Sequence, residues 1–97
     1  MTKLMLVETI RAAIQVWAQQ HSIELAVFEV EPTGIAKNIR IILAARKGFE
    51  NWPEIEREES LYQHLRSTLG DAVVVNIMLT ITMTEEEYDQ YDRVEVA

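Results

Sequence analysis

The sequence predicts an α+β fold, with a single two-layer domain that spans residues 1–97. Three observations support this prediction. Apolar residues recur at helical spacing in two segments, they alternate with other residues in three further segments, and a helix-capping pattern follows the last of these. The expected order is therefore α-β-β-α-β-α. The simplest two-layer arrangement for that order is a three-stranded mixed sheet with two main helices on one face and a short C-terminal helix.

The first helix is expected over residues 4–20. Its apolar side chains fall three and four positions apart and therefore share one face. They are Leu6, Ile10, Ala13, Ile14 and Trp17. We expect Trp17 to anchor the core, with its indole N–H directed to a polar partner or to water.

Two strands, residues 23–31 and 37–46, are expected to form a hairpin around the turn at Pro32, Thr33 and Gly34. The first strand changes its pattern near Ala26 and Val27, which predicts either a bulge there or a start that is buried on both faces. The second strand alternates regularly. One of its faces carries Ile39, Ile41, Leu43 and Ala45, and the other carries Arg40, Ile42, Ala44 and Arg46.

The second helix is expected over residues 51–69. Asn51 with Glu54 three residues later matches a capping pattern, and Pro53 is tolerated in a first turn. The apolar stripe of this helix consists of Ile55, Leu61, Tyr62, Leu65 and Leu69. Gly70 is suited to end the helix.

Residues 72–82 predict the third strand, and the rest of the chain is interpreted as covering it. Its odd positions, Val73, Val75, Ile77, Leu79 and Ile81, are all aliphatic, whereas its even positions are mixed. We expect the odd positions to face the core and this strand to lie at an edge of the sheet. An edge without Lys or Pro invites pairing with another chain. The expected interface therefore includes Val74, Asn76, Met78 and Thr80.

A capping box from Thr84 to Glu87 predicts the third helix, which carries Tyr88 and Tyr91 on one side. These tyrosines either fold back over the edge strand or join the interface. Phe49 and Trp52 flank a turn, so they form either a hydrophobic staple on the second helix or, if exposed, an interface anchor.

Composition excludes several classes of protein. The chain has no Cys, which rules out disulfides and thiolate ligands, and its net charge of −7 disfavours nucleic acid and anionic membranes as partners. The N-terminus lacks a long apolar region, so we expect no signal peptide and no membrane span, and a cytoplasmic protein.

No catalytic or metal-binding motif stands out. His21 and His64 lack the spacing of a metal site, and the glutamates of residues 54–59 are interpreted as a solvated helix face partly neutralised by Arg57. Nucleophile motifs and a glycine-rich phosphate loop are absent from the sequence. We therefore expect no catalytic residue, no cofactor and no metal.

Charge is unevenly distributed along the chain. A basic strip consists of Lys37, Arg40, Arg46 and Lys47, within residues 34–49, which hold no acidic residue. Its arginines either pair with Glu24, Glu29 or Glu31 across the hairpin, or steer a partner or a second copy onto this surface. A contact with an anion or RNA is the third interpretation.

The order of elements, a helix before a hairpin, a helical crossover and a last strand, resembles the type II KH-like layout of the ribosome-binding factor A proteins. The resemblance covers most of the chain as an order of elements only. The KH signature GxxG is absent, since Gly34, Gly48 and Gly70 stand alone. The resemblance implies an RNA- or ribosome-associated factor that uses the basic strip.

Taken together, these patterns favour a small acidic module for protein–protein interaction or assembly, most simply a homodimer or part of a larger complex. The KH-like factor is the first alternative. The second is a small-molecule-binding domain, with a pocket between helix and sheet near Tyr62, Tyr88 and Tyr91.

Overall fold

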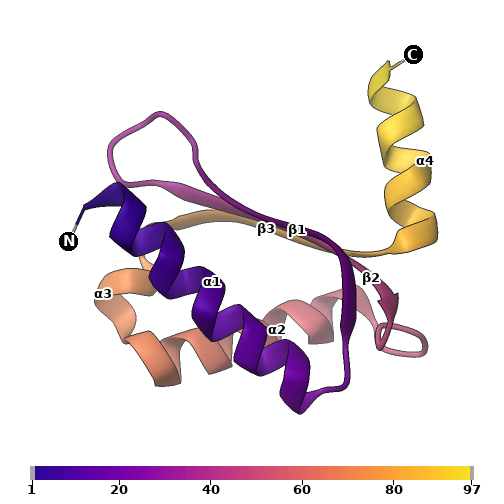
Figure 1. Ribbon diagram of the computed structural model, residues 1–97, viewed down its shortest axis with the longest axis horizontal. Helices are drawn as coiled ribbons and strands as arrows, with labels where there is room; N and C mark the ends of the chain where they lie inside the picture. The colour runs from indigo at the N-terminus through magenta and orange to yellow at the C-terminus, as the bar shows by residue number, and fades with distance from the viewer. Residues whose placement is uncertain (1, 97) are drawn as a thin grey trace.

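A computed structural model describes the backbone of residues 2–96 and the side chains of residues 2–91. The described chain forms an α+β domain in which a three-stranded mixed sheet carries its main helices on one face, as the sequence predicts (Figure 1). Its elements are α1 (Lys3–Gln20), β1 (Glu24–Pro32), β2 (Ile39–Lys47), α2 (Glu54–Leu69), α3 (Asp71–Val74), β3 (Ile77–Thr84) and α4 (Glu85–Val96). Among these described helices, none is long and apolar enough to cross a membrane.

The sheet order is β1-β2-β3, with β1 antiparallel and β3 parallel to β2. The hairpin is irregular where the sequence predicts a bulge, because the pairing with β2 shifts between Leu25 and Val27 and leaves Ala26 without a partner in the register. β2 lies at the centre of the sheet and buries Ile39, Ile41 and Leu43 completely. β3 is an edge strand, as expected.

The core lies between the sheet and the pair α1 and α2. The predicted face of α1, from Leu6 to Trp17, is buried in it. Two hydrogen bonds join the helices: the Trp17 indole N–H donates to the Ser60 hydroxyl at 3.0 Å, and His64 Nε2 lies 2.9 Å from the Ala13 carbonyl oxygen. Because a carbonyl only accepts, Nε2 of His64 carries the proton. These bonds set the two helices side by side over the sheet.

The start predicted for β3 is wrong. Residues 71–74 form α3, and the strand begins only at Ile77. Gly70, at φ +88°, ends α2, and the chain then winds into a second short helix whose Ala72 carbonyl accepts a hydrogen bond from the Asn76 side chain at 3.0 Å. A short apolar run of β-branched residues fits a turn of helix as well as a strand. The run therefore does not show where the strand begins, and a short helix follows Gly70 instead.

The face predicted for β3 is correct for Ile77, which is buried, but it is wrong for the rest of this strand. Its helix-facing side chains include Thr80 and Thr82, while Leu79 and Ile81 lie on the opposite face. The Thr80 hydroxyl donates to the Tyr62 hydroxyl at 3.1 Å, and the Thr82 hydroxyl donates to Glu58 at 3.3 Å. Because α2 supplies polar partners, these threonines are satisfied against the helix layer, and the aliphatic positions are left to the other face.

The start of α2 differs from the prediction as well. The helix begins at Glu54, and its N-cap residue, Pro53, makes no side-chain capping bond. Asn51 is no cap because its backbone is left-handed, at φ +63°, a conformation that asparagine tolerates better than most residues. The segment 48–53 is instead held in place by Arg57.

Arg57 is the principal polar side chain of the core. Its side chain is 8% exposed, and its guanidinium donates to three backbone carbonyls: those of Trp52 at 2.7 Å, Thr82 at 3.1 Å and Phe49 at 3.3 Å. It also lies 4.8 Å from the centre of the Phe49 ring and 3.6 Å from Glu87. One side chain therefore joins α2 to the segment 48–53, the edge strand β3 and the start of α4.

An arginine from the helix layer also binds a backbone carbonyl of β1, the edge strand on the other side of the sheet. Arg11, from α1, donates to the carbonyl of Phe28 in β1 at 3.2 Å and lies 4.3 Å from the centre of the Phe28 ring. Each edge strand thus has one carbonyl occupied by an arginine from the helix above it. This occupation reduces the number of open hydrogen-bonding groups along both edges.

Replacing Arg57 with Met is expected to destabilise the protein by about 2–4 kcal/mol, because buried carbonyls lose their donor. Arg57→Lys should fall between this variant and the wild type, since lysine lacks the planar fork. The matched control is Arg66→Met on the same helix. Arg66 is 60% exposed, and its ion pair among the described residues is with Asp71 at 2.9 Å, so its loss should cost less than about 1 kcal/mol. Urea unfolding measures all three, and equal losses for Arg57→Met and Arg66→Met would contradict the role of Arg57.

Glu58 gives a second prediction, because its partial burial, followed by repulsion from Glu54, raises the pKa of its carboxyl. A raised folded-state pKa contributes stability that is present below the unfolded pKa and lost as pH rises through the folded one. Ionised Glu58 therefore costs stability at neutral pH. Glu58→Gln should be more stable than the wild type at pH 7 by about 0.5 kcal/mol or less. The difference should vanish near pH 4 in urea unfolding, and Glu59→Gln, an exposed neighbour, should show no such trend.

Candidate functional site

The second face of the sheet is the candidate site. In β2, alternate residues point away from α1 and α2, and their partners in the two neighbouring strands point the same way. We call this surface the open face. It consists of Val27, Glu29 and Glu31 from β1, Arg40, Ile42, Ala44 and Arg46 from β2, and Leu79, Ile81 and Met83 from β3.

The open face is apolar at its centre. Ile42 pairs with Ile81 in the register and both are half-buried, while Leu79 beside them is 46% exposed. Toward the end of the strands, Ala44 and Met83 are buried, where α4 contacts β2 and β3. The helix layer covers only the other face of the sheet. Within residues 2–91, whose side chains the structure describes, no helix covers the apolar strip of Val27, Ile42, Leu79 and Ile81.

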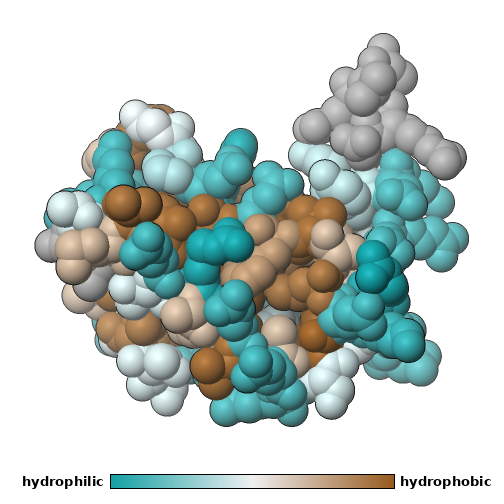
Figure 2. Space-filling view, in the orientation of Figure 1, coloured by the Kyte–Doolittle hydropathy of each residue, from teal (hydrophilic) through white to brown (hydrophobic). Residues whose placement is uncertain are grey.

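Two raised segments border the open face. The loop of residues 33–38 lies at one end and α4 stands at the other, both on the side away from α1 and α2 (Figure 1). The side chains of the loop rise above the middle of the molecule in Figure 2. The loop presents Ile35, which is 69% exposed, and α4 presents Tyr91, which is 39% exposed. The open face is thus the floor of a groove with an apolar side chain on each wall.

Local sequence holds both walls in place. The loop is closed by hydrogen bonds from the Thr33 N–H to the Asn38 carbonyl at 2.9 Å and from the Asn38 N–H to the Ile35 carbonyl at 3.0 Å. The start of α4 is the predicted capping box. The Thr84 N–H donates to the Glu87 carboxylate at 2.8 Å, and the Glu87 N–H donates to the Thr84 hydroxyl at 3.1 Å.

Ion pairs line the rim of the groove. Arg40 bonds Glu31 at 2.9 Å, and Arg46 bonds Glu24 at 3.0 Å and Glu85 at 3.5 Å. The hydrogen bond from Arg40 to Glu31 and the negative charge of Glu31 raise the pKa of Arg40. Both arginines of the basic strip therefore have carboxylate partners from their own chain, which leaves them less available to phosphate.

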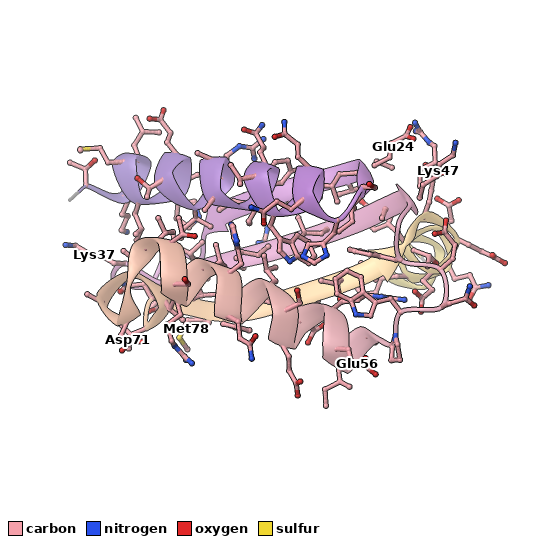
Figure 3. The ribbon with its side chains drawn as sticks, turned by 90° about the horizontal axis from the view of Figure 1, so that it is seen from below. Glu24, Lys37, Lys47, Glu56, Asp71 and Met78 are labelled. Carbon is pink, nitrogen blue, oxygen red and sulfur yellow. The ribbon has the colours of Figure 1, made fainter. Side chains whose placement is uncertain are left out.

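The two lysines of the basic strip lie apart from each other. Lys37 is at the loop end of the sheet, whereas Lys47 is at the other end, beside its register partner Glu24 (Figure 3). Lys47 belongs to the helix-facing positions of β2, so it does not border the groove. The strip is therefore not one continuous basic surface, and Lys37 is its cation on the loop wall.

Several residues predicted for the interface lie elsewhere. Val74 is buried in α3, Asn76 caps that helix through its side chain, and Thr80 faces α2. Met78 is 62% exposed. Together they do not form one surface, because the strand that was expected to display them begins later and has the opposite facing.

Phe49 is 1% exposed and therefore cannot anchor an interface. It packs with Trp52, which is half-buried, at a ring distance of 6.2 Å, and both rings contact Trp17. His21 stacks on Trp52 at 5.2 Å. This aromatic cluster closes the end of the core.

The pocket predicted from three tyrosines does not form. Tyr62 lies on α2, in the helix layer, whereas Tyr88 and Tyr91 lie on α4, on the other side of the sheet (Figure 1). A cavity of about 290 Å³ does open at the base of α4, beside Arg46, Phe49, Glu50 and Glu85. The Glu50 carboxylate there accepts the Gly48 N–H at 2.8 Å, which lowers the pKa of Glu50.

Among the described residues, no group of three His, Cys, Asp or Glu side chains is placed to hold a metal ion. The His21 ring lies against Trp52, and His64 is hydrogen-bonded to the Ala13 carbonyl.

Two features of the structure were missed from the sequence, although signals for both exist. Arg57 stands four residues before Leu61 and eight before Leu65, which places it on the buried stripe of α2. Residues 41–45 of β2 are an unbroken apolar run, which is typical of a strand that is covered on both faces. This run therefore indicates that another layer, from this chain or from a partner, packs on the second face of the sheet.

A substitution at Glu87 tests how the capping box stabilises the start of α4. Hydrogen bonds from Thr84, the backbone N–H foremost, lower the pKa of Glu87. A lowered folded-state pKa contributes stability that is present above the unfolded pKa and lost as pH falls through the folded one. Glu87→Gln should therefore be less stable than the wild type at pH 7, by about 0.3–1 kcal/mol, and equal to it near pH 2–3. Helix content by circular dichroism during urea unfolding measures this. Glu86→Gln, in the same turn, should show a smaller effect, and an equal one would contradict the capping role.

Comparisons of the chain with models of protein families, with curated proteins and with solved structures find no match. The open face is therefore the feature from which a function follows.

Proposed function

We propose that this protein is a small, acidic, non-catalytic module for protein–protein interaction or assembly, and that it binds another protein chain through the open face. The observation that supports this proposal is the apolar strip of Val27, Ile42, Leu79 and Ile81, which none of the described side chains of the helices covers. Apolar patches with a polar border on soluble domains mark interaction sites.

The architecture of the sheet adds a second argument. Strands that are buried on both faces carry nearly continuous apolar runs, and residues 41–45 of the central strand β2 form such a run. Here α1 and α2 cover one face, and α4 covers only the end of the other at Ala44 and Met83. A bound chain that lies on Ile42 and Ile81 supplies the missing layer.

The composition of the groove also fits an interface. Its centre is aliphatic, its walls present Ile35 and Tyr91, and its rim carries the ion pairs of Arg40 and Arg46. Protein interfaces commonly have such an apolar centre within a polar rim, and tyrosine and arginine are enriched in them.

Site-specific photo-crosslinking in the native cells tests this proposal. A photoreactive residue at Leu79 is expected to form a covalent adduct with a protein partner, whereas the same residue at Val16 is not. Both side chains are 46% exposed, but Val16 lies on α1, outside the open face. Ile81→Asp should abolish the adduct while circular dichroism shows an intact fold. Equal labelling at both positions, or none at Leu79, would contradict the proposed function.

A further inference from the structure

We propose that the chain bound by the open face is a second copy of this protein. The two open faces pack against each other with their strands antiparallel, in a symmetric dimer that we call head-to-tail. In this dimer, α4 of each copy lies against the 33–38 loop of the other. The inference rests on the proposed function and names its partner.

The first argument is the state of α4. The helix has 12 residues, which makes it about 18 Å long. It is fixed to its own domain at its start, by the capping box, by Arg46–Glu85 at 3.5 Å and by Arg57–Glu87 at 3.6 Å, and it then runs away from the body (Figure 1). Isolated helices of this length are marginal in water. A partner that packs along α4 would stabilise it.

The second argument is geometric. Ile39 pairs with Ile77 at the loop end of the sheet, and Ala45 pairs with Thr84 at the α4 end, so the two walls stand at opposite ends of the groove. Facing sheets pack about 10 Å apart. A helix of about 18 Å that rises from one sheet therefore reaches past the facing sheet. In a head-to-tail dimer, it arrives beside the partner's loop.

The third argument is charge. On α4, Glu85 and Glu87 are engaged in the contacts above, while Glu86 and Asp89 are exposed. A dimer in which the two copies run in the same direction brings two acidic helices together, which is unfavourable. The head-to-tail dimer instead places each α4 near Lys37, which is exposed and has no ion pair among the described residues. The exposed Ile35 beside it meets the Tyr91 side of the helix.

The dimer completes both grooves at once. Each open face receives the strip of the other, and each loop wall receives a helix. The long-range repulsion between two chains of charge −7 is damped at about 0.15 M salt, where the screening length is about 8 Å. Close contacts such as Lys37 with the partner's α4 are screened less.

Charge exchange between copies tests the orientation. Lys37→Glu makes both symmetry-related contacts repulsive, and so does Asp89→Lys, so each variant alone should raise the dimer dissociation constant by about tenfold or more. A mixture of the two variants restores opposite charges at both contacts. It should therefore form heterodimers, with an affinity near that of the wild type. Sedimentation equilibrium at about 0.15 M salt measures each case.

Lys47→Glu is the matched control, because it makes the same charge change on the helix-facing side of β2. It should dimerise like the wild type and show no preference for Asp89→Lys. A wild-type chain that stays monomeric up to about 0.5 mM would overturn the dimer, and a mixture with no preference for heterodimers would overturn its orientation. A Leu79 adduct whose mass shows a different protein, formed by a monomeric chain, would overturn this inference and leave the proposed function standing.

Discussion

The guanidinium of Arg57 is the contact on which the rest of the arrangement depends. It is almost fully buried, and burial of a cation is costly unless its donors are satisfied. Here they are satisfied by carbonyls from two segments that are distant from each other in the chain, 49–52 and Thr82, with Glu87 nearby. The position of β3 relative to α2, the turn before α2 and the start of α4 are therefore set together. Neither the position of β3 relative to α2 nor the turn before α2 is determined by local backbone preference alone.

The helix layer and the polar interior of β3 follow from the same arrangement. Because Arg57, Glu58 and Tyr62 lie along one side of α2, the strand beneath them turns threonines toward the helices, at Thr80 and Thr82. The aliphatic residues of the strand then have only the other face to occupy. The uncovered apolar strip is the consequence of satisfying polar groups inside the core, and it is this strip that we connect to binding.

The predictions succeeded where a single periodic pattern dominated. The five apolar residues of α1 fall on one helical face without exception, and Ile39, Ile41, Leu43 and Ala45 share one face of β2, so the burial of these residues follows from spacing alone. The capping box at Thr84 and Glu87 was found because both partners lie within one turn. The candidate site was predicted only in part. Tyr91 and Lys37 are on its walls, but Ile42, Leu79 and Ile81 were not expected to form its floor.

The sequence by itself determined the α+β class and the order of the main elements, because these depend on patterns within about twenty neighbouring residues. An edge position was expected for β3, but the order of the strands is fixed only by tertiary pairing. Only the tertiary structure decided where β3 begins, which of its faces meets the helices, and that Arg57 is buried. An alternation of period two shows that a strand has two unlike faces. It does not show which of these faces will pack against a helix that supplies hydrogen-bonding partners. That information lies in α2, more than twenty residues earlier in the chain, and it is read only when the two elements pack together.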